Sequence, residues 1–180
     1  IALVFICNSL ETNALSIVTI ECFLPVSLHE IDAATFQGIV ALDHIMGIQN
    51  EIDLNVMPAA VFTSPEAASV GMTEDECKEK GIAVKCLKSF FRANGKAVTM
   101  GETDGFCKVV VASQAKEGDM QLFPEGQILG CHLYGPHSSD IIQEACAMIS
   151  RKATLSEFQD IIHTHPTLTE VLQSGGINIL

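Results

Sequence analysis

The sequence lacks the signatures that define several common protein classes. Its seven cysteines form no Cys-x-x-Cys motif and no close pair, which argues against a disulfide framework and against a redox disulfide. We expect reduced, mostly buried thiols of the kind found in cytoplasmic proteins. Gly-x-Gly-x-x-Gly and P-loop motifs are also absent, so the sequence predicts no cofactor-binding residue from these signatures.

Basic residues are scarce. No Lys or Arg precedes Lys78, and the formal net charge is -12. A chain with spread acids and no basic cluster is a poor partner for nucleic acid or for an anionic membrane. The apolar runs at 1–7 and 17–28 fall short of the ~20 residues of a membrane span, and no basic leading region suggests a secretory signal. We therefore expect a soluble, acidic protein of one domain, with or without an appendage.

Helical spacing of apolar residues predicts two longer helices. One begins with Asp32 as its N-cap and ends at Gly47, and the other begins with Ser138 or Ser139 as its cap. A shorter helix over residues 73–81 begins at a capping box formed by Thr73 to Glu76, and a second short helix covers residues 154–162.

The remaining ordered segments are rich in β-branched residues and are bounded by turn residues. They predict strands at 59–63, 67–71, 82–91, 97–100, 106–113 and 127–134, with a polar hairpin loop at 116–126. Residues 1–31 predict short strands or an irregular segment. Together these elements indicate an α+β fold, in which an antiparallel β-sheet has helices packed on one face.

Residues 161–170 bring together several side chains that could take part in catalysis. Histidine is the side chain type suited to proton exchange near neutral pH, and Pro166 restricts the backbone beside His165. Glu170 follows five positions later and could reach back to the ring. A carboxylate bonded to one ring nitrogen leaves the other free to exchange protons, so His165 and Glu170 are our candidate catalytic pair.

A structural role for Glu170 is equally compatible with the sequence. Thr167 to Glu170 matches the capping box, in which the Thr167 side chain caps a helix and the side chain of Glu170, at the third helical position, accepts the Thr167 backbone N–H. A cap would itself hold Glu170 at a defined place, so the two interpretations do not exclude each other.

A metal site is not predicted. His163 and His165 would share a strand face, but structural zinc needs four ligands and catalytic zinc three protein ligands. Cys131 and His132 are adjacent and would point to opposite faces of a strand.

Three runs of sequence resemble the pyridine nucleotide-disulfide oxidoreductases, in the order found in that family. They are Met57 to Gly71 (MPAAVFTSPEAASVG), Gly130 to Pro136 (GCHLYGP) and His163 to Glu170 (HTHPTLTE). The match covers about residues 32–172 and is to the C-terminal dimerisation domain. Within the family, the runs look most like those of dihydrolipoamide dehydrogenases.

The resemblance implies a set of functional expectations. His165 would be the acid–base catalyst, Glu170 would orient it, and His165-Pro166 would be a cis peptide. The parent protein would be a homodimeric dihydrolipoyl dehydrogenase that uses FAD and NAD and acts on the lipoamide-bearing acyltransferase of a 2-oxoacid dehydrogenase complex. The histidine of one subunit would serve the redox disulfide of the other.

The resemblance also defines what is missing. In the family, the FAD domain, the NAD domain and the redox cysteine pair precede this domain, so the chain looks like a fragment. We expect residues 1–31 to be an unassigned segment outside the family, 32–55 a helix and connector, 56–174 the dimerisation domain, and 175–180 a tail. Two functions follow as alternatives: half of an oxidoreductase site, or a catalytically inert dimerisation module without FAD or NAD sites.

Overall fold

The structure is a computed structural model of the 180-residue chain, and it describes residues 3–8, 15–20, 31–49, 51–115 and 121–174. The chain forms two compact units, residues 1–54 and residues 55–180. None of the helices in the described part is both long and apolar enough to cross a membrane.

The first unit contains an antiparallel hairpin and one helix. Strands β1 (Leu3–Asn8) and β2 (Leu15–Ile20) pair along their whole length, which confirms the short strands expected there. Helix α1 (Ile31–Ile45) begins two residues earlier than predicted, so Asp32 lies inside the helix and not at its N-cap. Gly47 follows its end with a φ of 68°, a left-handed conformation that favours glycine.

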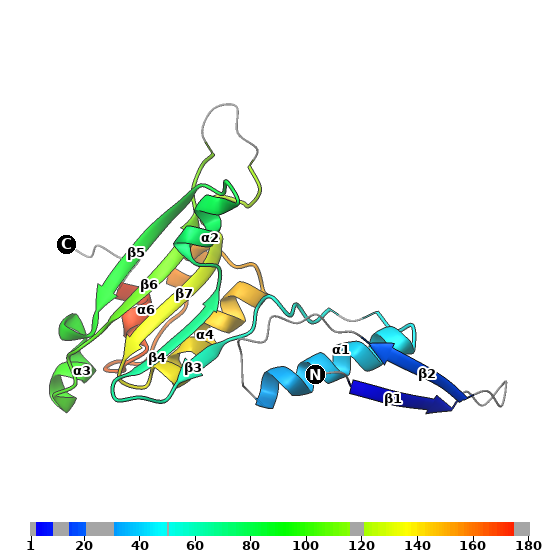
Figure 1. Cartoon of the computed structure of the whole chain (residues 1–180). Helices are drawn as coiled ribbons and strands as arrows, with labels where there is room; N and C mark the ends of the chain where they lie inside the picture. Colours follow the sequence, from blue (N-terminus) through cyan, green and yellow to red (C-terminus); the bar gives the residue numbers. More distant parts are fainter. Residues whose placement is uncertain (1–2, 9–14, 21–30, 50, 116–120, 175–180) are drawn as a thin grey trace. The chain divides into compact units, whose positions relative to one another are not determined.

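The second unit is built on a five-stranded antiparallel sheet with the order β3-β4-β7-β6-β5 (Figure 1). The strands are β3 (Ala59–Val61), β4 (Glu66–Gly71), β5 (Val84–Phe90), β6 (Phe106–Ala112) and β7 (Ile128–Gly135). The helices are α2 (Glu74–Glu79), α3 (Gly95–Met100), α4 (Ser138–Ser150), α5 (Leu155–Gln159) and α6 (Glu170–Ser174). The α+β fold with an antiparallel sheet and helices is therefore confirmed.

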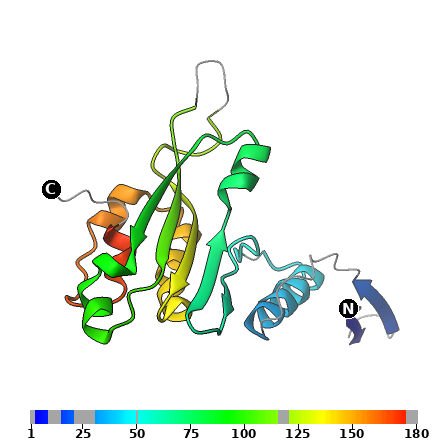
Figure 2. The same cartoon turned by 60° about the vertical axis from the view of Figure 1, so that its left-hand side comes forward.

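Alternation along the strands gives the sheet two different faces. On β6, Cys107, Val109 and Val111 face the main core with α4, α5 and α6, whereas Val110 and Ala112 face a smaller cluster with Cys77 of α2. Figure 2 shows the consequence, with α5 and α6 on one side of the sheet and α2 on the other. The helices thus gather mainly on one face, and the short α2 covers one end of the opposite face.

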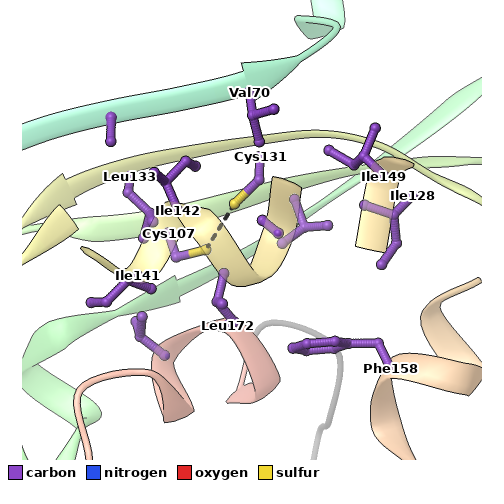
Figure 3. Close-up of a cluster of buried hydrophobic side chains, with 14 of the residues drawn as sticks. Val70, Cys107, Ile128, Cys131, Leu133, Ile141, Ile142, Ile149, Phe158 and Leu172 are labelled. Atoms are coloured by element: carbon purple, nitrogen blue, oxygen red, sulfur yellow. Dashed lines mark hydrogen bonds between the residues drawn. The ribbon is translucent and has the colours of Figure 1, made fainter. Parts of the chain in front are cut away.

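The main core lies between the sheet and α4. Ile141, Ile142, Ala145 and Ile149 of this helix are buried against the sheet, as the predicted apolar stripe requires. Beneath them, Phe158 of α5 and Leu172 of α6 close the core (Figure 3).

Two buried cysteines meet in this core. The sulfurs of Cys107 and Cys131 are 3.9 Å apart (Figure 3), on neighbouring strands but 24 residues apart in sequence. A disulfide needs about 2.05 Å between sulfurs, so this is a contact between thiols. The Cys107 thiol and burial together raise the pKa of Cys131 well above its ordinary value, which makes the Cys131 thiol a poor nucleophile.

A β-bulge in β7 changes which of its residues face each side of the sheet. Val110 pairs with Gly130, but Val111 pairs with Ile128, so Leu129 is an extra residue in the ladder. Ile128 therefore faces the main core while Leu129 turns to the α2 side.

Two sequence predictions in this unit are wrong. Residues 97–100 form helix α3 and not a strand, because the Asn94 side chain accepts a hydrogen bond from the Ala97 N–H and caps a helix that begins at Gly95. The predicted helix at 154–162 is shorter, since α5 ends at Gln159.

The predicted cap of α4 is also wrong. His137 occupies the N-cap position without a side-chain bond, and the Ser138 hydroxyl donates to the Gly135 carbonyl. The N–H and hydroxyl of Ser139 both donate to the carboxylate of Glu66, at 2.9 and 2.7 Å. An acidic residue from β4 therefore stabilises the positive end of α4.

The close approach at Gly130 gives a stability prediction. A Cβ at Gly130 would lie 2.0 Å from the Met72 carbonyl oxygen, whereas a Cβ at Gly95 meets no atom within 4 Å. We expect Gly130→Ala to lower the free energy of unfolding by about 1–3 kcal/mol, and Gly95→Ala to be neutral or to raise it by up to about 1 kcal/mol. Urea unfolding followed by circular dichroism measures both, and equal stabilities would contradict the tight packing of β7 against Met72.

Candidate functional site

The candidate site is the segment that joins α5 to α6. His163 and His165 lie in this connection, and Glu170 is the first residue of α6. The peptide bond between His165 and Pro166 is cis, as the family resemblance led us to expect. The buried side chains of Phe158, Val171 and Leu172 fix the two helices to the core on either side of the segment.

The structure brings His165 and Glu170 together. The Nδ1 atom of His165 is 2.8 Å from Oε1 of Glu170. An ionised carboxylate only accepts hydrogen bonds, so the proton of a neutral ring must lie on Nδ1 and Nε2 must be the basic nitrogen. Within the described part of the chain, Nε2 has no hydrogen-bond partner. The His165 side chain is 77% exposed, so this nitrogen is accessible to a reactant.

The second oxygen of Glu170 performs the capping role. Oε2 accepts the Thr167 backbone N–H at 2.7 Å. The Thr167 hydroxyl, however, donates to the Thr164 carbonyl at 2.9 Å and does not complete the box. Both interpretations of Glu170 therefore hold at once, with one oxygen assigned to each.

The two other Thr-x-x-Glu sequences that precede helices, at Thr73 and Thr154, show how this arrangement differs from a full capping box. At Thr73 and at Thr154, the full capping box forms. In each, one glutamate oxygen receives both the threonine N–H and the threonine hydroxyl. Glu170 differs because the Thr167 hydroxyl is directed away and its second oxygen binds an imidazole.

Hydrogen bonding keeps Glu170 ionised. The Thr167 N–H is the main cause that lowers its pKa below the ordinary 4.5, and His165 adds to the effect, while partial burial opposes it. The carboxylate is thus maintained in the charged form that can accept the His165 proton.

His163 has a different environment from His165. Its side chain is only 8% exposed, and its Nε2 lies 2.7 Å from Oε1 of Glu144 on α4. Its Nδ1 lies 3.0 Å from the Ile161 carbonyl oxygen, and the Phe158 ring meets it edge-on at 5.5 Å. Both nitrogens of His163 are therefore occupied, and neither is available to a reactant.

Two buried polar residues hold the segment from the sheet side. The Asn94 amide donates to the Thr167 carbonyl at 3.0 Å, while its oxygen caps α3. The Ser89 hydroxyl of β5 donates to the Val171 carbonyl. These bonds join positions more than 70 residues apart, so they fix the segment relative to the sheet.

Sequence reasoning missed Asn94, Ser89 and Glu144 as parts of the site. Asn94 carried only a turn signal, and Glu144 lies between apolar positions of α4 with no motif of its own. No sequence motif indicates a contact between residues that are so far apart along the chain.

The main core offers no site suited to a flavin or nicotinamide nucleotide. A cavity between the sheet and α4 is lined only by apolar side chains, among them Val109, Cys131 and Phe158. It offers no polar group for a phosphate, and the sequence has no Gly-rich phosphate loop. His132 and Cys131 point to opposite faces of β7, as expected, and no group of three metal-ligating side chains occurs among the described residues.

The family is decided by a match to a whole domain. Residues 57–175, more than half of the chain, match the model of the pyridine nucleotide-disulphide oxidoreductase dimerisation domain. The chain belongs to this family.

Individual relatives agree with the match to the dimerisation domain. The chain is 41% identical over 147 residues to a dihydrolipoyl dehydrogenase of Synechocystis, a match that covers 79% of this chain and 29% of the relative. It is 43% identical over 144 residues to that of Chlamydia muridarum, covering 80% and 29%. The chain thus spans less than a third of these relatives.

Solved structures share the fold. LpdA from Mycobacterium tuberculosis superposes with a TM-score of 0.68 at 23% identity, over 79% of this chain and 29% of that one. The HOCl-induced flavoprotein disulfide reductase RclA from Escherichia coli gives 0.63 at 23% identity, over 79% and 31%. Residues 57–175 are therefore a pyridine nucleotide-disulphide oxidoreductase dimerisation domain that is similar in sequence to those of dihydrolipoyl dehydrogenases.

The lowered pKa of Glu170 gives a prediction for acid stability. A carboxyl group with a depressed pKa in the folded state stabilises the fold above its ordinary pKa of 4.5, and this contribution is lost as the pH falls through the lowered value. We expect Glu170→Gln to lower the free energy of unfolding by about 0.5–1 kcal/mol near pH 7. The deficit should shrink towards about pH 3.

Urea unfolding at a series of pH values measures this effect. Glu102→Gln is the matched control, because Glu102 is exposed and has no side-chain hydrogen bond among the described contacts. A deficit that stayed constant with pH would assign the loss to packing and not to the charge.

Proposed function

We propose that the dimerisation domain supplies His165 and Glu170 as an acid–base pair to a redox disulfide on a partner subunit of a longer, homodimeric dihydrolipoyl dehydrogenase. The observation that carries the proposal is the His165 imidazole, whose Nδ1 is bound to an ionised Glu170 while its Nε2 is exposed. FAD, NAD and the disulfide would reside in the other domains of the parent protein.

In the proposed reaction, Nε2 of His165 accepts a proton from a thiol of a dihydrolipoyl group. The resulting thiolate attacks one sulfur of the disulfide, so that a new S–S bond forms as the old one breaks and the second sulfur leaves as a thiolate. Glu170 stabilises the imidazolium that forms and keeps the ring in one orientation. A proton acceptor matters because the thiolate, and not the thiol, is the nucleophile.

The geometry favours His165 over His163 as the base. A general base needs a nitrogen within hydrogen-bond reach of the reactant. His163 has both nitrogens engaged and is nearly buried, whereas His165 presents Nε2 to solvent. His163 is thus suited to hold the segment and not to exchange protons.

The alternative is an inert dimerisation module. It is supported by the absence of a Cys-x-x-Cys motif and of nucleotide-binding signatures in this sequence. Both proposals predict that the isolated chain does not turn over lipoamide. They predict different activities once matching FAD and NAD domains are joined to the chain.

Three single variants in such a joined protein test the catalytic assignment. We expect His165→Gln to reduce kcat by about 10²–10⁴-fold, because general acid–base catalysis contributes about that much. Glu170→Gln should cost less, since the base remains but is poorly oriented, and His163→Gln should cost least. Steady-state kinetics with thermal melts measure all three, and a dominant effect of His163→Gln with an intact fold would mean that we have assigned the wrong imidazole.

Self-association gives a prediction that needs only the chain itself. Ile162 is 97% exposed and lies three residues before His165, in the region that we expect a second copy to cover. Burying one Ile contributes about 1.5–3 kcal/mol, and a two-fold interface buries it twice. We therefore expect Ile162→Asp to raise the dimer dissociation constant by at least about 100-fold.

Sedimentation or light scattering over a concentration series measures the dissociation constant. Leu122→Asp is the matched control, because Leu122 is also an exposed aliphatic residue, at 52%, but lies in the loop before β7. Equal weakening by the two variants would remove the segment around His165 from the interface.

A further inference from the structure

Glu144 lies outside the acid–base pair, yet it holds the segment that carries His165. It projects from α4, whose neighbouring residues Ile141, Ile142 and Ala145 are buried against the sheet. Its carboxylate reaches His163 over 19 residues of sequence, with 2.7 Å between Oε1 and Nε2. The longest helix of the second unit is thereby connected to a turn that has little regular structure of its own.

The His163 ring is bound from three sides. Glu144 faces Nε2, the Ile161 carbonyl faces Nδ1, and the Phe158 ring packs against it. Both nitrogens therefore point at oxygen acceptors. A neutral imidazole has one N–H donor and one bare nitrogen, so the ring satisfies both acceptors only when both nitrogens carry protons.

We propose that Glu144 is a positioning residue for the acid–base reaction: its carboxylate holds the His163 ring, and this contact fixes the turn from which His165 projects. This inference rests on the proposed function of His165. It assigns the two histidines opposite tasks, since both nitrogens of His163 face oxygen atoms that hold the turn, whereas only one nitrogen of His165 is bound.

The charges around His163 are consistent with this division. Glu144 approaches from α4 and Glu170 from the start of α6, while α5 contributes the uncharged Phe158 ring. Asp160 and His165 are the other titratable groups of the connection between α5 and α6, and His165 is bound to Glu170. A charged pair that is only partly exposed is screened less by salt than a surface pair, so Glu144 can hold His163 more firmly than an exposed acid could.

A matched pair of variants in α4 tests the inference. Glu144→Gln keeps the shape of the side chain and removes its charge. Asp140→Asn makes the same change one turn earlier, where Asp140 pairs with His137 at 3.3 Å and is 82% exposed. Both variants alter a His–carboxylate pair on the same helix, but only one of the pairs touches the turn.

Nitrogen-15 spectra of the imidazoles in this chain give a readout that stability alone would not move. In the wild-type chain, we expect Nδ1 of His165 to carry a proton, because it faces the Glu170 carboxylate. Glu144→Gln should shift the Nε2 signal of His163, which faces this side chain, and should shift or broaden the His165 signals. Asp140→Asn should change neither ring.

Kinetics in the protein joined to its FAD and NAD domains provide the second readout. We expect Glu144→Gln to lower kcat by about 10-fold with little change in KM, because small misplacements of a catalytic group can cost up to about 10²-fold, and Asp140→Asn to leave kcat unchanged. The inference is overturned if the His165 signals and kcat of Glu144→Gln match those of Asp140→Asn. If His165→Gln itself left kcat unchanged, the proposed function would fail, while the spectra would still decide whether Glu144 controls His163.

Discussion

The pairing of β6 with β7 is the constraint on which the rest of the domain depends. These strands are buried on both faces, because alternating residues contribute to the main core and to the α2 cluster, and the bulge at Leu129 only shifts the phase of this alternation in β7. The main core face then supports α4 and α6 through apolar contacts with side chains such as Leu172. Since α6 begins at Glu170, the packing of the sheet sets the position of the carboxylate that binds His165.

The site is therefore a local turn whose geometry is imposed from three distant places. Asn94 binds the backbone at Thr167, Ser89 binds it at Val171, and Glu144 binds the His163 ring. Each anchor comes from a different element, so no single local interaction determines where His165 lies. An exposed base in a turn would otherwise sample many positions, and orientation is a large part of what a catalytic group contributes.

Local signals in the sequence were sufficient for most of the fold. Alternation and turn residues located the five strands of the sheet, and the resemblance to the family located His165 and Glu170. The prediction failed where a short polar residue had two possible uses. Asn94-Gly95 has the sequence of a turn between strands, but the Asn94 side chain caps a helix and also reaches the candidate site. The same ambiguity affected Ser138 and Ser139, whose capping role is taken by Glu66 from β4. In such cases the role of the polar residue depends on a tertiary contact, and the local sequence pattern does not reveal that contact.

The three Thr-x-x-Glu sequences that precede helices show the same limit at the site itself. Their spacing is identical, and it predicts a capping box at each. At Thr73 and Thr154 the box is complete, since the threonine hydroxyl accepts the glutamate N–H and a glutamate oxygen accepts the threonine N–H. At Thr167 the hydroxyl donates to the Thr164 carbonyl, and the spare oxygen of Glu170 binds the imidazole five residues earlier. Because the Thr167 N–H still lowers the pKa of Glu170, the interaction that starts the helix also keeps the carboxylate charged for His165. Helix capping and the orientation of the proposed base are thus two consequences of one carboxylate.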